Sequence, residues 1–345
     1  MTLDHLPYHP LLHLTNQSLG FVSAAEGFVF VSGLVSAWVY GAILVKHGER
    51  PLRRRILRRA RDIYLTHLFL LSLPLLASLC ARRTIMLSAD LWRPWWHGSP
   101  RGILPMYAVF LLLTPTVLKQ IAKGHAAWIW AASIALWLAA QFGVGTPGHT
   151  PWLQLGFFNI LAWQLLFFAG LFFGCTQAAA SSGWGLPVPV SRMLLPFSLA
   201  LVTGLFIVRH QSVFHGHLAL LNMHLALSRW RSINHPLRLI NFAAWAYLIW
   251  WVPRSVDSWL KDLPAIRFLR YLGRHSLQVF AWSVFVSYVA FGYRSWWASR
   301  SPAWQMLLAL IAAFSLSLPA WLHGQWKLMS AHSTSRLDGS VVTPS

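Results

Sequence analysis

Long apolar runs, separated by short polar or basic stretches, dominate the chain. Nine of them are each close to the length that crosses a hydrocarbon core of about 30 Å as a helix. They cover residues 21–45, 63–81, 103–118, 126–142, 157–178, 193–208, 237–252, 275–292 and 302–322. Because the runs are continuous and do not alternate with a period of two, they predict helices and not strands. The pattern therefore predicts an all-α, polytopic transmembrane helix bundle with about nine spans.

The composition agrees with this pattern. Hydrophobic residues make up 56% of the 345 residues and charged residues 10%, against about 25% charged residues in typical soluble domains. We expect one transmembrane domain over residues 1–330 and a short polar cytoplasmic tail over residues 331–345. The net charge of +20 would favour nucleic-acid binding in a soluble chain. In a membrane protein, basic loops set orientation and contact anionic lipid, so we expect lipid and no nucleic acid as a partner.

The basic residues predict an orientation. If residues 46–62 are cytoplasmic, eighteen of the 28 Lys and Arg residues lie in predicted inside segments. This asymmetry predicts a cytoplasmic C-terminus, with residues 1–20 outside. An odd number of spans with the N-terminus outside, and no signal peptide in residues 1–20, is an unusual arrangement. One further helix before Met1 would resolve it.

Glu26 lies inside the first apolar segment. A carboxylate in a membrane helix costs roughly 2.5–3.5 kcal/mol on insertion scales, so it needs a partner or a function. Gly33, Ala37 and Gly41 recur at a spacing of four residues, and such a stripe lets another helix approach closely. Glu26 is therefore expected to face the bundle interior. Two interpretations remain open: a catalytic carboxylate, or one that pairs with an internal Arg or His to fix packing.

Residues 46–62 carry eight Lys and Arg residues. Most clusters of this kind anchor the topology of a membrane protein. The alternative is that the cluster binds a phosphorylated cytoplasmic donor, because guanidinium groups suit phosphate oxygens. On a helix, Arg54, Arg58 and Arg61 would line one side.

A few polar residues lie within or at the edges of the predicted spans, namely Asn159, Gln164, His275 and Gln278. Polar groups in a bundle must form hydrogen bonds, and contacts between helices are favoured here over contacts with substrate. The sequence predicts no metal site and no permanently bound cofactor. His215, His217 and His224 have no Cys or acidic residue beside them, and the two cysteines form no motif.

An ordered set of motifs resembles the OpgC family, a glucan succinyltransferase-like branch of the acyltransferase-3 group of integral membrane acyltransferases. The motifs are Asp4-His5-Leu6-Pro7, the stretch 20–33, Tyr40-Gly41, Arg58-Arg59-Ala60, Tyr64, His67, the stretch 103–107, Phe157-Phe158-Asn159, the stretch 162–167, Pro236-Leu237-Arg238-Leu239 and the stretch 272–280. The resemblance covers nearly the whole chain.

The resemblance implies a ten-helix bacterial inner-membrane enzyme. Such an enzyme moves an acyl group, succinyl in the namesake, from a cytoplasmic coenzyme A thioester to a periplasmic glucan hydroxyl. In the wider group a first helix carries an arginine, ten further residues and a histidine. The histidine maps onto His5, so the arginine would fall before Met1. The expected first helix is thus the one that the charge distribution also requires.

The resemblance and the chemistry together give a set of candidate site residues. A sugar hydroxyl needs a general base, and a histidine, with an ordinary pKa of about 6.5, can accept and return a proton. We expect His5 to be this base and Glu26 to orient and charge-stabilise it. Residues expected to bind substrate or support the site are Asp4, Asn159, Gln164 and His275. Those expected to hold the phosphates of acyl-CoA (succinyl-CoA), the donor substrate, are Arg58, Arg59 and Arg61.

Two other functions remain open at this stage. A polytopic transporter or flippase would move a solute without chemistry, although no clear repeat relates the two halves of the chain. An inactive, truncated acyltransferase homologue would keep the fold and lack part of the site.

Overall fold

The structure is a computed structural model that describes residues 2–6, 8–10, 19–80, 102–146, 150–155, 157–181, 194–215, 232–251 and 263–338. Its longer helices are α2 (Ala24–His47), α3 (Glu49–Cys80), α4 (Ile103–Ala122), α5 (Ala126–Gln141), α6 (Ile160–Ser181), α7 (Leu194–His215), α9 (Pro236–Trp251), α11 (Pro264–Arg274), α12 (Ser276–Gly292), α14 (Pro302–Ser315) and α15 (Ser317–Asp338). Short pieces are η1 (Leu3–His5), η4 (Pro151–Leu153), α13 (Arg294–Ala298), β1 (Gln154–Leu155) and β2 (Phe158–Asn159). The predicted all-α class is confirmed.

Several helices have the length and composition of membrane spans. Three stretches are long and apolar enough to cross a bilayer: Ala24–His47, Ile103–Ala122 and Pro302–Lys327. Shorter apolar helices are Ala126–Gln141, Ile160–Thr176, Leu194–Arg209 and Ser276–Gly292. Each of these overlaps a predicted segment, and the other two predicted segments overlap α3 and α9. The chain has the character of a membrane protein, and the number of nine spans stays a prediction.

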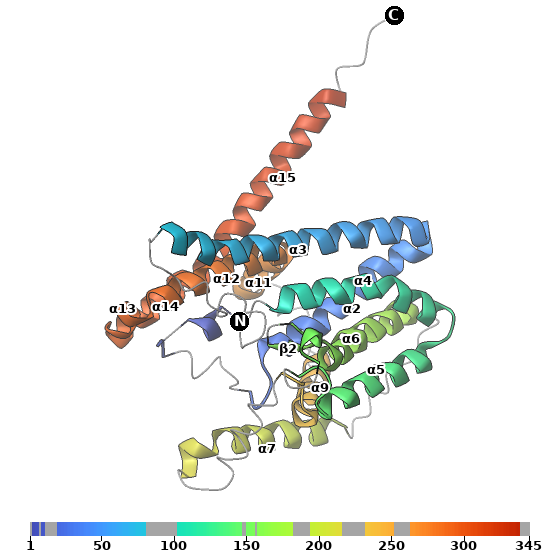
Figure 1. The fold of residues 1–345 in the computed structure, drawn as a ribbon, viewed down its shortest axis with the longest axis horizontal. Coiled ribbons are helices and arrows are strands. Elements are labelled where there is room, and N and C mark those ends of the chain that lie inside the picture. The colour runs from blue at the N-terminus through green and yellow to red at the C-terminus, as the bar shows by residue number, and fades with distance from the viewer. Residues whose placement is uncertain are drawn as a thin grey trace, which may run out of the picture. The chain divides into compact units, whose positions relative to one another are not determined.

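The chain comprises two compact units, one formed by residues 17–251 and the other by residues 1–16 with 252–345. In the first unit, α2 packs along α6, α5 packs on α6, α3 packs on α4, and α7 packs on α9 (Figure 1). The hairpin of β1 and β2 precedes α6, and its register pairs Gln154 with Asn159.

Glycines allow the backbones of α2 and α6 to approach closely. A Cβ atom added to Gly33 would overlap the carbonyl oxygen of Phe167, and one added to Gly170 would overlap the carbonyl oxygen of Phe30. One added to Gly174 would lie 2.6 Å from Cβ of Ala37. The predicted small-residue contact is therefore confirmed at positions 33 and 37. Position 41, by contrast, has no atom within 4 Å of an added Cβ.

The basic cluster belongs to a continuous helix. α3 runs for 32 residues from Glu49, so the arginines and the following apolar segment share one helix. Arginine favours helix almost as well as leucine, so the loss of apolar character does not end it. Its buried side chains recur at helical spacing on one stripe: Leu52, Ile56, Ala60, Ile63, His67 and Leu70. Most arginines lie on the exposed side.

In the second unit, the first residues of the chain pack against helices of its C-terminal part. Leu6 is buried and packs in a cluster with Ala290, Trp297, Ala309 and Ala312. In the same unit α12 and α11 pack on α15. Helix α15 continues to Asp338, so residues 331–338 of the predicted tail are helical.

Candidate functional site

Glu26 lies at the first turn of α2 and is fully buried. Ser23 is the residue that caps this helix, and its backbone N–H donates to Oε2 of Glu26 at 2.9 Å. The Ser23 hydroxyl donates to the same oxygen at 2.5 Å. A carboxylate at this position also interacts favourably with the helix dipole. The sequence Ser-Ala-Ala-Glu therefore fixes the carboxylate locally, before any distant contact is made.

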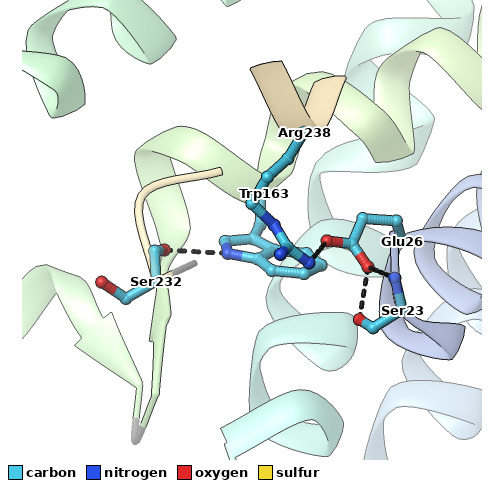
Figure 2. Close-up of polar contacts among 5 residues, drawn as sticks. All are labelled: Ser23, Glu26, Trp163, Ser232 and Arg238. Atoms are coloured by element: carbon cyan, nitrogen blue, oxygen red, sulfur yellow. Dashed lines mark hydrogen bonds and ion pairs between the residues drawn. The ribbon is translucent and has the colours of Figure 1, made fainter. Parts of the chain in front are cut away.

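The other carboxylate oxygen of Glu26 accepts a hydrogen bond from Nη2 of Arg238, at the start of α9 (Figure 2). Both side chains are almost completely buried, with exposures of 1% for Arg238 and 0% for Glu26. Two opposite charges in the interior compensate each other, whereas either alone would carry a large desolvation cost. The pair is the internal Arg partner that the packing interpretation of Glu26 expects.

The turn before α9 is held by donors from α5, α6 and β2. The Trp163 indole N–H donates to the Ser232 carbonyl at 2.9 Å (Figure 2), and the Gln141 amide donates to the Ile233 carbonyl at 2.8 Å. Trp137 donates to the Asn234 carbonyl at 3.0 Å. The backbone N–H of Asn159 also donates to the Ser232 carbonyl, at 3.1 Å. These contacts fix where α9 begins, and so where Arg238 stands.

Two of the predicted supporting residues make hydrogen bonds within the protein. Asn159 caps α6, because its Oδ1 accepts from the Leu161 N–H at 3.0 Å, while its Nδ2 donates to the Val144 carbonyl at 2.8 Å. Gln164 and Ser133 bond reciprocally across α6 and α5, at 2.6 Å and 2.8 Å. Contacts between structural elements, as the sequence favoured, account for both side chains. A contact with substrate stays a prediction.

His5 ends the turn η1 and is exposed, while Asp4 lies in the same turn and its side chain is outside the described residues. His5 belongs to the unit of residues 1–16 and 252–345, and Glu26 belongs to the other unit. The predicted pairing of His5 with Glu26 stays a prediction. His9, four residues on, is buried and its Nε2 lies 2.8 Å from the Leu3 carbonyl oxygen.

The three arginines predicted to bind the donor do not share one environment. Arg58 and Arg61 are exposed, and Arg61 makes an ion pair with neighbouring Asp62 at 3.3 Å. Arg59 is half-buried and lies close enough to Tyr40 and Tyr107 to interact electrostatically with both. Consecutive residues on a helix point about 100° apart, which is why Arg59 leaves the exposed face.

His275 lies between α11 and α12, where its Nδ1 is 2.8 Å from Nδ1 of His323 on α15. Nε2 of the His323 ring is 3.4 Å from Nε2 of Gln278. These contacts tie α12 to α15. The candidate substrate role of His275 stays a prediction.

Arg238 is the residue that the sequence did not assign to a site. It lies at the edge of the predicted apolar segment 237–252. The available signal was the cost of Glu26, which requires a cation, together with an arginine bordering a span. In the part of the chain that the structure describes, no three His, Cys, Asp or Glu side chains come together as a metal site. His217 and His224 lie outside the described residues.

Comparison with known proteins gives one match. A sequence model of the family described as OpgC protein matches residues 1–93 and 101–328. Neither a curated protein nor a solved structure gives a significant match. The family match covers nearly the whole chain, including α2 with Glu26 and α9 with Arg238.

Proposed function

The chain belongs to the OpgC protein family, and from this premise we propose that it is a multi-pass membrane O-acyltransferase. In the proposed reaction an acyl group, succinyl by resemblance to the namesake, passes from acyl-CoA to a hydroxyl of a periplasmic glucan or related saccharide. The family match over nearly the whole chain is the observation that carries this proposal. Membership indicates an acyltransferase-like membrane protein of glucan modification, and the donor, acceptor and inner-membrane location are part of the proposal.

The proposed chemistry is direct attack of the sugar hydroxyl on the thioester carbonyl. His5 takes the hydroxyl proton as the new C–O bond forms, and returns it to the coenzyme A thiolate after the C–S bond breaks. An exposed histidine at the end of a short turn is accessible to such a substrate. Asp4, beside it, is proposed to support the acceptor.

Glu26 is proposed to support this site from the first turn of α2. Its bonds to Ser23 and Arg238 hold the carboxylate in one place. In the proposal this carboxylate orients the His5 imidazole and stabilises its positive charge. Asn159, Gln164 and His275 are proposed to shape the site through the helix contacts described above.

The donor is proposed to bind at the exposed basic side of α3. Arg58 and Arg61 present exposed guanidinium groups there, and Arg59 lies at its inner edge. Coenzyme A carries phosphates, which guanidinium groups bind well. No permanently bound cofactor is part of the proposal, because the coenzyme A thioester is consumed as substrate.

The test is mass spectrometry of envelope and periplasmic saccharides from cells that carry the wild-type chain, a deletion or a His5→Ala variant. We expect acyl groups on the glucan only with the wild type, and equal membrane insertion of the variant. His125→Ala, an exposed histidine in the turn between α4 and α5, is the matched control. Unchanged acylation in His5→Ala would reject His5 as the base. Unchanged decoration with altered distribution in the deletion would support a transporter.

A further inference from the structure

A polar stripe lies at the beginning of α9 and is formed by Asn234, Arg238 and Asn241. All three side chains are at most 1% exposed. Arg238 and Asn241 are three residues apart and so lie on one face of the helix. Asn234 precedes them by about one turn, in the turn that α5 and α6 hold in place. The stripe therefore begins in a turn that hydrogen bonds from α5 and α6 hold in place.

Much of the hydrogen-bonding capacity of this polar stripe is unused. Among the described residues, neither Nε nor Nη1 of Arg238 has a hydrogen-bond partner, and the same holds for both amide atoms of Asn234 and of Asn241. Nε and Nη1 together carry three N–H donors. Buried polar groups are nearly always paired, because leaving them unpaired costs free energy. So many buried polar atoms without a partner at one place indicate a ligand that would form the missing hydrogen bonds.

The charges near the polar stripe favour an anion. Glu26 compensates one positive charge through Nη2 of Arg238. Arg209, on α7, lies close enough to interact with the Arg238 charge. Among these three buried or half-buried groups, two are cationic and one is anionic. Two guanidinium groups near one another favour an anionic ligand over a cationic one.

The backbone at Gly20 packs close to the polar stripe without forming a hydrogen bond to it. Gly20, with φ +94°, passes so near Asn241 that a Cβ atom on it would lie 2.6 Å from Nδ2. The glycine brings only a Cα hydrogen against this amide. Gly20 thus supplies no hydrogen bond to this amide.

We propose that Asn234, Arg238 and Asn241 form an oxyanion-binding subsite that holds an anionic group of a substrate. The ligand class is a carboxylate or a phosphoryl group. This rests on the proposed function in one respect: a dicarboxylic acyl group such as succinyl ends in a carboxylate. A phosphoryl substituent on a saccharide has the same chemistry, and the test separates the two sources.

The test measures thermal stabilisation of the purified full chain by succinate and by inorganic phosphate. We expect one of these anions to raise the melting temperature of the wild type. Asn241→Ala and Asn234→Gly should weaken its apparent affinity about tenfold or more, since a hydrogen bond to a charged group is lost. Neither variant should melt earlier without ligand, because neither amide bonds to the described protein. Glycine at position 234 suits its φ of +48°.

Thr114→Ala is the control, because that buried side chain makes its hydrogen bond within its own helix. It should melt earlier and keep the anion response. Stabilisation by succinate alone would assign a carboxylate, and by phosphate alone a phosphoryl group. No anion response in the wild type, or an equal response in Asn241→Ala and Asn234→Gly, would overturn the subsite. Anion binding that persists when no glucan is acylated would count only against the proposed reaction.

Discussion

Arg238 donates to Glu26 across 212 positions of sequence, joining the start of α9 to the first turn of α2. Neither residue is exposed, and Glu26 is also tied to Ser23. The Glu26 carboxylate therefore connects α2 to α9, and it is also a candidate catalytic group.

The ion pair predicts strong coupling between its two residues. Glu26→Gln or Arg238→Gln alone leaves a buried charge uncompensated and should destabilise the protein by about 3–5 kcal/mol. The double variant should lose clearly less free energy of unfolding than the two single variants together, because no uncompensated charge of the pair remains. Unfolding of the detergent-solubilised protein measures each step of the cycle. Additive losses would show that the two side chains do not form a pair in solution.

Titration of His235 should make the stability of the protein depend on pH. Nδ1 of His235 accepts from the Leu237 N–H at 3.3 Å and so caps α9. Burial, and then the charge of Arg238, lower the pKa of His235 from its ordinary value of 6.5. The unfolded chain therefore binds the proton more readily, and stability should fall as the pH drops below about 6.5 towards the folded-state pKa.

The His235 contribution is measured by melting temperature against pH for the wild type and for His235→Asn. Asparagine keeps an acceptor at the cap and does not titrate. The melting temperature of the variant should change less than that of the wild type between neutral and mildly acid pH. Parallel curves for the two proteins would remove His235 as the source.

The contact between α2 and α6 predicts a steric effect. Gly33→Ala and Gly170→Ala should each destabilise the protein by about 1–3 kcal/mol, because an added methyl group meets the backbone of the other helix. Gly41→Ala is the control, since nothing lies within 4 Å of its added Cβ. It should be neutral or slightly stabilising, because alanine favours helix. Equal effects at positions 33 and 41 would argue against the close packing.

Titration of Glu49 should lower the stability of the protein in a second, more acid pH range than titration of His235. Glu49 accepts from Lys119 of α4 and Arg53 of α3, both at 2.9 Å, and these hydrogen bonds lower its pKa below 4.5. Its contribution should be present above pH 4.5 and disappear as the pH falls through the lowered pKa. Glu49→Gln should thus differ from the wild type at neutral pH and converge with it in acid. Both partners of Glu49, Arg53 and Lys119, are exposed, so we expect a small difference that salt reduces.

The basic side of α3 predicts an effect on donor affinity. Arg58→Gln combined with Arg61→Gln should raise KM for acyl-CoA with little change in kcat, because phosphate contacts act before the chemical step. Lys123→Gln, an exposed cation near the end of α4, is the control. If KM stayed unchanged while membrane insertion or expression fell, the arginines would be topology anchors.

Local features of the sequence predicted the helices well. Continuous apolar runs placed α2, α4, α5 and α6 to within a few residues, because hydrophobicity and helical periodicity are properties of neighbouring residues. The small-residue spacing at Gly33 and Ala37 predicted the close helix contact for the same reason. The extension of α3 back to Glu49 was less visible, because hydropathy marks the apolar part of a helix and not its ends.

Contacts between distant segments could not be predicted in this way. The cost of Glu26 called for a cation, and pairing with an internal Arg or His was one interpretation. Nothing local in the sequence chose Arg238 among the 28 Lys and Arg residues. The lack of a partner for the Asn234 and Asn241 amides among the described residues could not be predicted either, because hydrogen bonding of a buried side chain depends on what packs around it.

The turn at residues 232–234 has a consequence for how variants of this protein should be interpreted. Its carbonyls are held by side chains of Trp137, Gln141 and Trp163, which come from helices far from it in sequence. A genetic screen for lost activity would therefore recover these tryptophans together with Arg238, although their indole N–H groups bond only the carbonyls of the turn. The positions that such a screen finds would include residues that do not contact a substrate. Biochemical assays on single variants would be needed to distinguish residues that position the turn from residues that take part in the reaction.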